Sequence, residues 1–466
     1  MVVWAILAGG TLTAIGQSDT LDPRALTAGT FTTPSSDKHA FDVPIAMLDK
    51  EQLVAFASGK EQFNEQWVVA PEPGVWGLGP TFNEDRCIFC HEANGRARAV
   101  LPGQQAELGM LLRLSVPGVA KDGGPIAHPH YGEQLQNRGV DGRVPEEGQA
   151  VVSYVEHKVT LADGEVVSLR QPRIQLTGMK FGDPGSQTLM SLRSAPAIVG
   201  MGLLEAVPEK TILALAQAQA GTGMQGKPNY VWDVENELTV LGRFGWKANQ
   251  PNLRQQTAAA FFGDIGATTY LFPEENCPPV QVACLELPSA SKCGGQGGCT
   301  GNQFRPEVVP SRLTNITFYM QTLAVPARRN VDDPAVQQGE KLFAQARCDL
   351  CHIPTLQTEA KPAVRAAANL TFHPYTDLLL HDMGEGLADG RPDFKASGSE
   401  WRTAPLWGVG LLRTVNGHQD LLHDGRARNV TEAILWHGGQ GEPSREAFKR
   451  MSKAEREALV RFVDSL

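Results

Sequence analysis

The stretch Arg347-Cys348-Asp349-Leu350-Cys351-His352 is the most informative part of the sequence for the fold, because it contains the pattern C-x-x-C-H. The same pattern occurs earlier, at Cys87-Ile88-Phe89-Cys90-His91, where an arginine, Arg86, again comes directly before it. C-x-x-C-H is the attachment site of a c-type haem: both thiols bond to the porphyrin, and the histidine supplies a nitrogen ligand to the iron. A redox-active C-x-x-C pair and half of a zinc site are the alternatives.

Two copies of this pattern in a chain with only eight cysteines favour haem over both alternatives. The sequence therefore predicts two covalently bound haem c groups as cofactors. The residues predicted to attach and ligate them are Cys87, Cys90 and His91 at the first site, and Cys348, Cys351 and His352 at the second.

Length and composition indicate a globular protein of ordinary polarity. The chain has 466 residues, of which 42% are hydrophobic and 20% are charged. This length predicts two to three domains. The net charge of −9 argues against nucleic-acid binding, because a protein that binds phosphates needs clustered lysine and arginine.

The N-terminal segment predicts export. Residues 1–16 contain a short apolar run with small residues, typical of the hydrophobic part of a secretory signal and too short to span a bilayer. Haem attachment to C-x-x-C-H resembles that of proteins outside the cytoplasmic membrane, so we expect a periplasmic location. Residues 17–47 are rich in polar residues and predict an extended leader. We expect no integral membrane span.

Short words of sequence occur twice and predict an internal duplication. An R-[ST]-A-P word begins at Arg193 and again at Arg402, and a G-x-x-x-F word precedes each haem motif, at Gly59 and at Gly339. Both arginines would suit the carboxylates of haem propionates through bidentate pairing, the alternative being ordinary salt bridges.

The predicted fold class is mainly α, with two cytochrome-c-like haem domains related by this duplication. The first domain is expected over residues 48–325 and the second over residues 326–466. Apolar residues at helical spacing predict helices before the first motif and at the end of each half, over residues 48–67, 313–323 and 455–466.

The first predicted domain contains two insertions. Around residues 150–175 a tight turn at Asp163-Gly164 separates two β-branched runs, which predicts a β-hairpin. Around residues 277–299 a Gly- and Pro-rich loop contains four cysteines without a C-x-x-C pattern, so two disulfides are expected rather than zinc. The pairing is left open among Cys277, Cys284, Cys293 and Cys299.

The sixth ligand of each iron determines what each haem can do. A strong second side-chain ligand leaves an electron-transfer haem, whereas an open position binds peroxide or oxygen. The chain has eleven histidines, and nine remain when the two motif histidines are set aside. In the second half, the run that begins Leu422-His423-Asp424-Gly425 and ends Trp436-His437-Gly438-Gly439 resembles a stretch of the bacterial di-haem cytochrome c peroxidases. This resemblance implies that His437 is the partner of His352 at the second iron, with Met383 as the rival ligand.

No equally clear sixth ligand exists for the first iron. The place that matches His437 is an apolar stretch over residues 258–262, so the first haem is expected to be open and catalytic. His128 and His130 are the residues that could close it as a displaceable ligand, and they could equally lie on the surface.

The run of residues 422–439, beginning Leu-His-Asp-Gly, resembles a stretch of the bacterial di-haem cytochrome c peroxidases that ends in a methionine ligand. In this chain His437 stands at that place. Two imidazole ligands would give the second haem a lower potential than the histidine–methionine haem of the peroxidases. The wider pattern is similar to the di-haem oxidoreductase, putative peroxidase family, from about residue 48 to residue 466. The words that carry the resemblance are RFGWKA at residues 243–248, HDMGEG at 381–386 and WHGG at 436–439.

The resemblance implies further site residues. Glu205 resembles the distal glutamate of the peroxidases, which moves a proton during peroxide cleavage, and the alternative is that it caps a helix beginning near Pro208. Trp246 corresponds to a tryptophan between the haems, the alternative being an aromatic core residue. The related enzymes also hold a calcium ion between domains, and no local acidic loop specifies one here.

Together these expectations describe an exported di-haem oxidoreductase that resembles a cytochrome c peroxidase. Electrons would enter at the C-terminal haem from a small cytochrome or cupredoxin, and hydrogen peroxide would be reduced at the N-terminal haem. The alternatives are a non-catalytic di-haem electron carrier and a haem oxygenase or protein-modifying oxidase.

Overall fold

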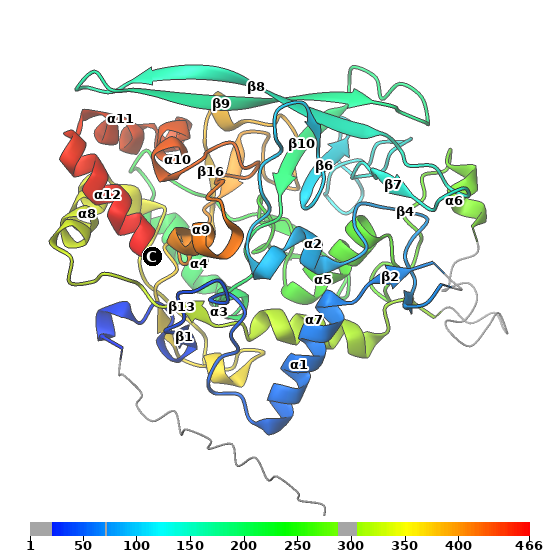
Figure 1. The fold of residues 1–466 in the computed structure, drawn as a ribbon, viewed down its shortest axis with the longest axis horizontal. Helices are drawn as coiled ribbons and strands as arrows, with labels where there is room; N and C mark the ends of the chain where they lie inside the picture. The colour runs from blue at the N-terminus through cyan, green and yellow to red at the C-terminus, as the bar shows by residue number, and fades with distance from the viewer. Residues whose placement is uncertain (1–20, 70–71, 288–304) are drawn as a thin grey trace, which may run out of the picture.

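Two helix pairs, one beside each C-x-x-C-H motif, form much of the frame of the molecule (Figure 1). Helix α1 (Lys50–Asn64) packs against α7 (Pro310–Gln321), and α8 (Pro334–Gln345) packs against α12 (Lys453–Ser465). The helices predicted from apolar spacing before the first motif and at the end of each half are therefore present. Both α1 and α12 begin with a capping box, which satisfies amide groups at the helix start that have no partner within the helix.

The computed structural model describes residues 21–69, 72–287 and 305–466. The predicted signal segment, residues 1–16, lies outside these ranges, as do Cys293 and Cys299. Within the described part of the chain, no helix is both long and apolar enough to cross a membrane.

Apart from 3-10 turns of three residues each, the remaining helices of the described chain are short and scattered between loops. They are α2 (Cys87–Cys90), α3 (Met201–Glu205), α4 (Glu209–Ala218), α5 (Leu253–Ala260), the π-helix η4 (Phe261–Ile265), α6 (Val282–Glu286), α9 (Leu412–Asn416), α10 (Val430–Trp436) and α11 (Glu442–Arg450).

The strands pair mostly in twos, and the sheets are small. The two-stranded sheets are β1 (Thr32–Thr33) with β13 (Val325–Pro326), β2 (Trp67–Val68) with β3 (Val75–Trp76), β4 (Thr81–Phe82) with β7 (Arg138–Gly139), β6 (Met110–Ser115) with β10 (Leu189–Ser194), β11 (Tyr230–Asp233) with β12 (Leu238–Leu241), β14 (Leu356–Gln357) with β15 (Thr371–Phe372), and β16 (Leu380–Asp382) with β17 (Glu400–Arg402). A three-stranded sheet has the order β5 (Gln104–Gln105), β8 (Gln149–Thr160), β9 (Val166–Thr177).

The predicted fold class is wrong in two respects. The protein is 31% helix and 19% strand, so it is not mainly α, and no cytochrome-c-like duplication is evident. The physical reason is that most strands here have only two or three residues and pair across loops. Strands of this length are too short to show an alternating pattern in the sequence. The two R-[ST]-A-P words differ in their surroundings, since Arg193 pairs with Asp393 whereas Arg402 donates to carbonyl oxygens.

The expected β-hairpin is present as β8 and β9, each of twelve residues, paired antiparallel from Gln149 opposite Thr177 to Thr160 opposite Val166. Figure 1 shows it as a long ribbon across one side of the molecule, over β6 and β10 at one end and over α10 and α11 at the other. Its tip is tied to α11, where the amide of Ala162 donates to the carbonyl of Lys449 at 3.0 Å. The hairpin therefore connects parts of the chain that are distant in sequence.

One large apolar core includes residues from both predicted halves and from the predicted leader. Phe31, Phe41 and Ile45 of the leader are almost fully buried in it, together with Phe63 and Phe462. Strand β1 of the leader pairs in parallel with β13, at the expected boundary between the halves. The described part of the leader is thus a packed element of the fold.

Candidate haem site

Both C-x-x-C-H motifs open onto one internal cavity of about 450 Å³. Its walls are largely apolar, and they include Phe41, Phe261 and Leu412. The motif residues on its wall are Cys87, Cys90, His91, Cys348, Cys351 and His352. The fold thus brings together two motifs that lie some 260 residues apart, since their histidines are at positions 91 and 352 (352 − 91 = 261).

At the first motif, the two cysteines lie on α2 and His91 follows directly at its end. The Nδ1 atom of His91 is 2.8 Å from the carbonyl oxygen of Pro196, so this nitrogen carries the proton and donates it. Burial lowers the pKa of His91 to about 4, which keeps the ring neutral. The Nε2 atom of a neutral imidazole is then available as a metal ligand. The ring that packs beside His91 is Phe63, at 6.1 Å between centroids.

At the second motif, the imidazoles of His352 and His437 face the cavity and lie beside each other. His352 Nδ1 is 2.9 Å from the carbonyl oxygen of Tyr375, and His437 Nδ1 is 2.7 Å from that of Ala433. Burial lowers the pKa of both rings, that of His352 to about 4 with the nearby His437 adding to the effect. Both Nε2 atoms therefore remain available as ligands.

The separation of these two rings suits a shared metal ion. Their centroids lie 6.5 Å apart, with an angle of 48° between the ring planes. A metal–imidazole bond of about 2 Å on each side, plus roughly 1 Å from each nitrogen to its ring centre, adds up to about 6 Å. The predicted rival ligand, Met383, also lines the cavity. A Cβ added at Gly441 would lie 3.0 Å from both the Cβ of His437 and the Cε of Met383, so these two side chains are neighbours.

The two arginines predicted to hold propionates differ in their partners. Arg193 already forms an ion pair with Asp393, at 3.0 Å. Arg402 lines the cavity and donates to the carbonyl oxygens of Gly245 at 3.0 Å and Thr403 at 3.1 Å, and burial lowers its pKa to about 10.

Arg96 is a cavity residue that sequence reasoning missed. Its guanidinium lies 4.9 Å from the ring centroid of Trp246, and it donates to the carbonyl of Leu422. Burial lowers the pKa of Arg96 to about 10. The sequence offered no signal for it, because Arg96 is one of two arginines within residues 92–98 and lies outside the repeated words.

Trp246 connects the two R-[ST]-A-P words. Its indole Nε1 donates to the carbonyl oxygen of Ser194 at 2.7 Å, and its own carbonyl accepts from the amide of Arg402 at 2.9 Å. The side chain lines the cavity that both motifs share. Trp246 therefore contacts segments that belong to both sites.

Glu205 ends helix α3, and both of its carboxylate oxygens accept hydrogen bonds. One accepts from the amide of Leu253, the first residue of α5, at 2.8 Å, and the other accepts from the side chain of Gln321 at 2.5 Å. Burial raises the pKa of Glu205. The described residues that line the cavity do not include Glu205. The helix whose start it caps is α5, rather than the one near Pro208.

Asp264 is a second residue that sequence reasoning missed. It lies in the π-helix η4 and lines the cavity together with Cys87 and Cys90. Burial is the main cause of the raised pKa of both thiols, and the negative charge of Asp264 raises it further. Gln134 donates to one of its carboxylate oxygens at 2.8 Å, and burial raises the pKa of Asp264. Short π-helical turns are frequent at functional sites, and apolar spacing does not reveal them.

His128 and His130 lie away from the motifs. The Nε2 atom of His128 is 3.0 Å from the carbonyl oxygen of Pro184, and its Nδ1 accepts from the amide of His130 at 3.1 Å. Neither histidine is among the described residues that line the cavity.

The cysteine-rich loop contains one disulfide in the described part, between Cys277 and Cys284, with 5.6 Å between their Cα atoms. Among the described residues, one group of three potential metal ligands has its ligand atoms within 4.8 Å of one another: Cys351, Asp377 and His381. A thiol, an imidazole and a carboxylate do not make the all-oxygen ligand set that calcium prefers.

The residues around the cavity fit haem. Neutral imidazoles and two free cysteine thiols at each motif lie on the wall of an apolar space. Haem needs such an imidazole for its iron and such thiols for thioether bonds to the porphyrin. Burying a guanidinium without an acidic partner is costly. Within the described chain Arg402 and Arg96 bond to carbonyl oxygens only, so an anionic group such as a propionate would offset that cost.

The chain matches the model of a known protein family. The model of a protein family described as "Di-haem oxidoreductase, putative peroxidase" matches residues 24–466, nearly the whole chain. Searches of the curated proteins and of the solved structures found no match.

Proposed function

Since the chain belongs to the di-haem oxidoreductase, putative peroxidase family, we propose that it is an exported c-type cytochrome oxidoreductase that reduces hydrogen peroxide. In this proposal the second site receives electrons from a small cytochrome or cupredoxin, and the first site receives the peroxide. Haem supplies the redox chemistry when bound: an iron with two imidazole ligands exchanges single electrons, and an iron with an open position accepts peroxide. Cys87, Cys90 and His91 would hold one haem, and Cys348, Cys351, His352 and His437 the other.

The observation that carries the proposal is the difference between the two motif histidines. His352 has Phe343 at 6.3 Å on one side and His437 at 6.5 Å on another. His91 has the equivalent phenylalanine, Phe63, and within the described chain no second imidazole packs against it. A site with two imidazoles favours electron transfer, and a site with one favours binding of a small oxidant.

Asp264 is the acid–base residue that we assign to the first site. Cleavage of a peroxide needs a group that takes a proton from one oxygen and delivers it to the other. Asp264 faces the cavity on the side of Cys87 and Cys90, and its raised pKa favours holding a proton nearer to neutral pH. Gln134 orients the carboxyl through its hydrogen bond. Glu205 remains the rival, since burial raises its pKa too.

Steady-state peroxide turnover with a reduced small cytochrome tests these assignments. We expect Asp264→Asn to lower kcat by about 100-fold, the lower end of what general acid–base catalysis contributes, and Glu205→Gln to lower it less than tenfold. The haem absorption spectra of both variants should match that of the wild type, which shows that the cofactors are in place.

The other outcomes are equally informative. A larger loss in Glu205→Gln would transfer the acid–base role to that residue. A wild-type protein that shows no high-spin signal, binds no cyanide and leaves peroxide untouched would be an electron carrier, and the proposed function would be wrong.

A further inference from the structure

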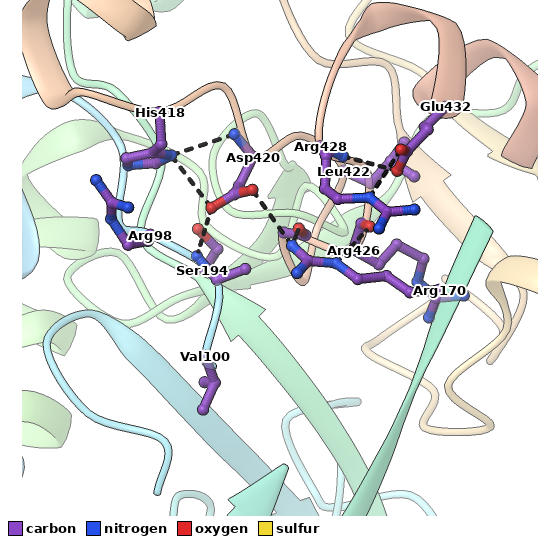
Figure 2. Close-up of polar contacts among 12 residues, drawn as sticks. Arg98, Val100, Arg170, Ser194, His418, Asp420, Leu422, Arg426, Arg428 and Glu432 are labelled. Carbon is purple, nitrogen blue, oxygen red and sulfur yellow. Dashed lines mark hydrogen bonds and ion pairs between the residues drawn. The ribbon is translucent and has the colours of Figure 1, made fainter. Parts of the chain in front are cut away.

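The β-hairpin β8–β9 contacts two chain segments that lie near different haem ligands in the sequence. One is residues 96–100, shortly after the first motif, and the other is residues 418–428, shortly before His437. Figure 2 shows Arg170 reaching from its strand to the second segment, with Asp420 between it and the first. The proposed function leaves this hairpin without a role.

Arg170 makes three hydrogen bonds to the second segment. It donates to the carboxylate of Asp420 at 3.3 Å, and to the carbonyl oxygens of Gly425 at 3.1 Å and Arg426 at 3.0 Å. Its side chain is only 12% exposed, so these are bonds from a desolvated cation, which are stronger than bonds between neutral groups.

The first segment closes the same set of contacts. Asp420 accepts from the amide of Ala99 at 3.0 Å, and Tyr154 of the hairpin donates to the carbonyl of Val100 at 2.8 Å. The Arg170 guanidinium lies 4.7 Å from the ring centroid of Tyr154. Residues from the two strands of the hairpin thus bind one segment each, and Asp420 joins the two segments directly.

From the second segment the contacts continue to helix α10. Arg426 lies with its guanidinium 4.8 Å from the ring centroid of Trp436, the residue directly before His437. Arg428 donates to the carbonyl of Ser168 on the hairpin at 2.6 Å and to Glu432 on the helix at 2.8 Å. Helix α10 has seven residues, and a helix this short depends on tertiary contacts for its position.

We infer that Arg170 is a positioning residue for the second site: it holds residues 420–428 in place, and through them helix α10 and the His437 imidazole. We call the hairpin in this role the strap. It keeps helix α10, which precedes His437, at a fixed position relative to residues 96–100. The inference rests on the proposed function only in taking His437 as an iron ligand.

The test uses the full-length holoprotein with Arg170→Gln and, as matched control, Arg173→Gln. Arg173 is exposed on the same strand, and its guanidinium donates a hydrogen bond to the side-chain oxygen of Gln171 at 3.4 Å. We expect Arg170→Gln to raise amide hydrogen exchange over residues 420–437 by about tenfold or more, because it removes bonds from a charged donor. The low-spin electron paramagnetic resonance signal and the midpoint potential of the second haem should shift with it. Arg173→Gln should match the wild type in all three measurements.

Arg170→Lys serves as the second variant if the glutamine variant does not fold. It keeps the charge near Asp420 but cannot make the forked bonds to the two carbonyls, so it should fall between wild type and Arg170→Gln. Wild-type exchange over residues 420–437 in either folded variant overturns the inference. A separate variant, His437→Ala, tests the ligand: an unchanged low-spin signal there would reject His437 as ligand, while the exchange comparison would still decide the role of the strap.

Discussion

At the scale of single residues, the surroundings of each histidine determine what it can do. His91, His352 and His437 each use Nδ1 in a hydrogen bond to a carbonyl oxygen, and burial keeps each ring neutral. This arrangement fixes the tautomer and leaves Nε2 available for a metal. His128 has both ring nitrogens engaged with the backbone, so its ring is not available in this arrangement.

Glu147 is a buried carboxyl whose titration should reduce stability as pH rises. It is 1% exposed and accepts hydrogen bonds from the amide of Gln136 at 2.7 Å and from Gln281 at 2.5 Å. Burial raises its pKa from 4.5 to about 8. The folded protein therefore binds this proton more tightly than the unfolded chain, and the contribution is fully present below pH 4.5 and lost as pH rises through 8.

We therefore expect the free energy of unfolding of the wild type to fall relative to that of Glu147→Gln between pH 5 and pH 8, by at most about 1.4 kcal/mol per pH unit. Denaturant unfolding at several pH values measures the difference. The control is Glu146→Gln, at a half-exposed neighbour that pairs with Lys180 at 3.6 Å, which should leave the slope unchanged. Parallel pH profiles for wild type and Glu147→Gln would contradict the prediction.

At the scale of elements, two glycines allow the helix pairs to approach closely. A Cβ on Gly59 of α1 would overlap the carbonyl oxygen of Asn315 on α7, and one on Gly339 of α8 would overlap that of Ala458 on α12. Phe63, one turn after Gly59, then reaches the ring of His91, and Phe343 reaches that of His352. The close approach thus places the phenylalanines beside the motif histidines.

Gly59→Ala and Gly339→Ala should each lower the free energy of unfolding by about 1–3 kcal/mol, the usual cost of forcing extra volume into a packed contact. The cost should outweigh the better helix propensity of alanine. Urea unfolding measures it, and Glu61→Ala, on the exposed face of α1, should change the value by less than about 0.5 kcal/mol. A neutral or stabilising effect of either glycine substitution would show that the helices can separate at no cost.

At the scale of the whole molecule, a single apolar core joins the predicted halves. The leader contributes Phe41, and the first and second halves contribute residues such as Tyr319 and Phe462 to the same cluster. The hairpin and the leader both cross from one half to the other. The two predicted halves therefore do not pack as independent domains.

We expect the full-length holoprotein to unfold in one calorimetric transition, because elements that share a core lose their packing together. Differential scanning calorimetry at two scan rates is the measurement. Two well-separated transitions would contradict the shared core and would instead favour independent domains with a boundary near residue 326.

Very short strands and repeated words of sequence explain why the predicted fold class differs from the observed one. The sequence predicts the long hairpin because two runs rich in β-branched residues flank the tight turn at Asp163-Gly164. Pairs such as β14 with β15 involve two residues on each side and leave no periodic signal. The repeated words around Arg193 and Arg402 suggested two equal domains, but tertiary contacts give the two arginines different partners.

The sequence by itself determined the chemistry that is encoded locally: two C-x-x-C-H motifs, the hairpin, the flanking helices and the family. Covalent spacing and periodicity carry that information within a few residues. Only the tertiary structure decided that both motifs open onto one cavity, that His437 lies beside His352, and that Asp264 faces the cavity while Glu205 turns to α5. The physical reason is that the direction of a side chain depends on how segments hundreds of residues apart pack, which no local pattern specifies.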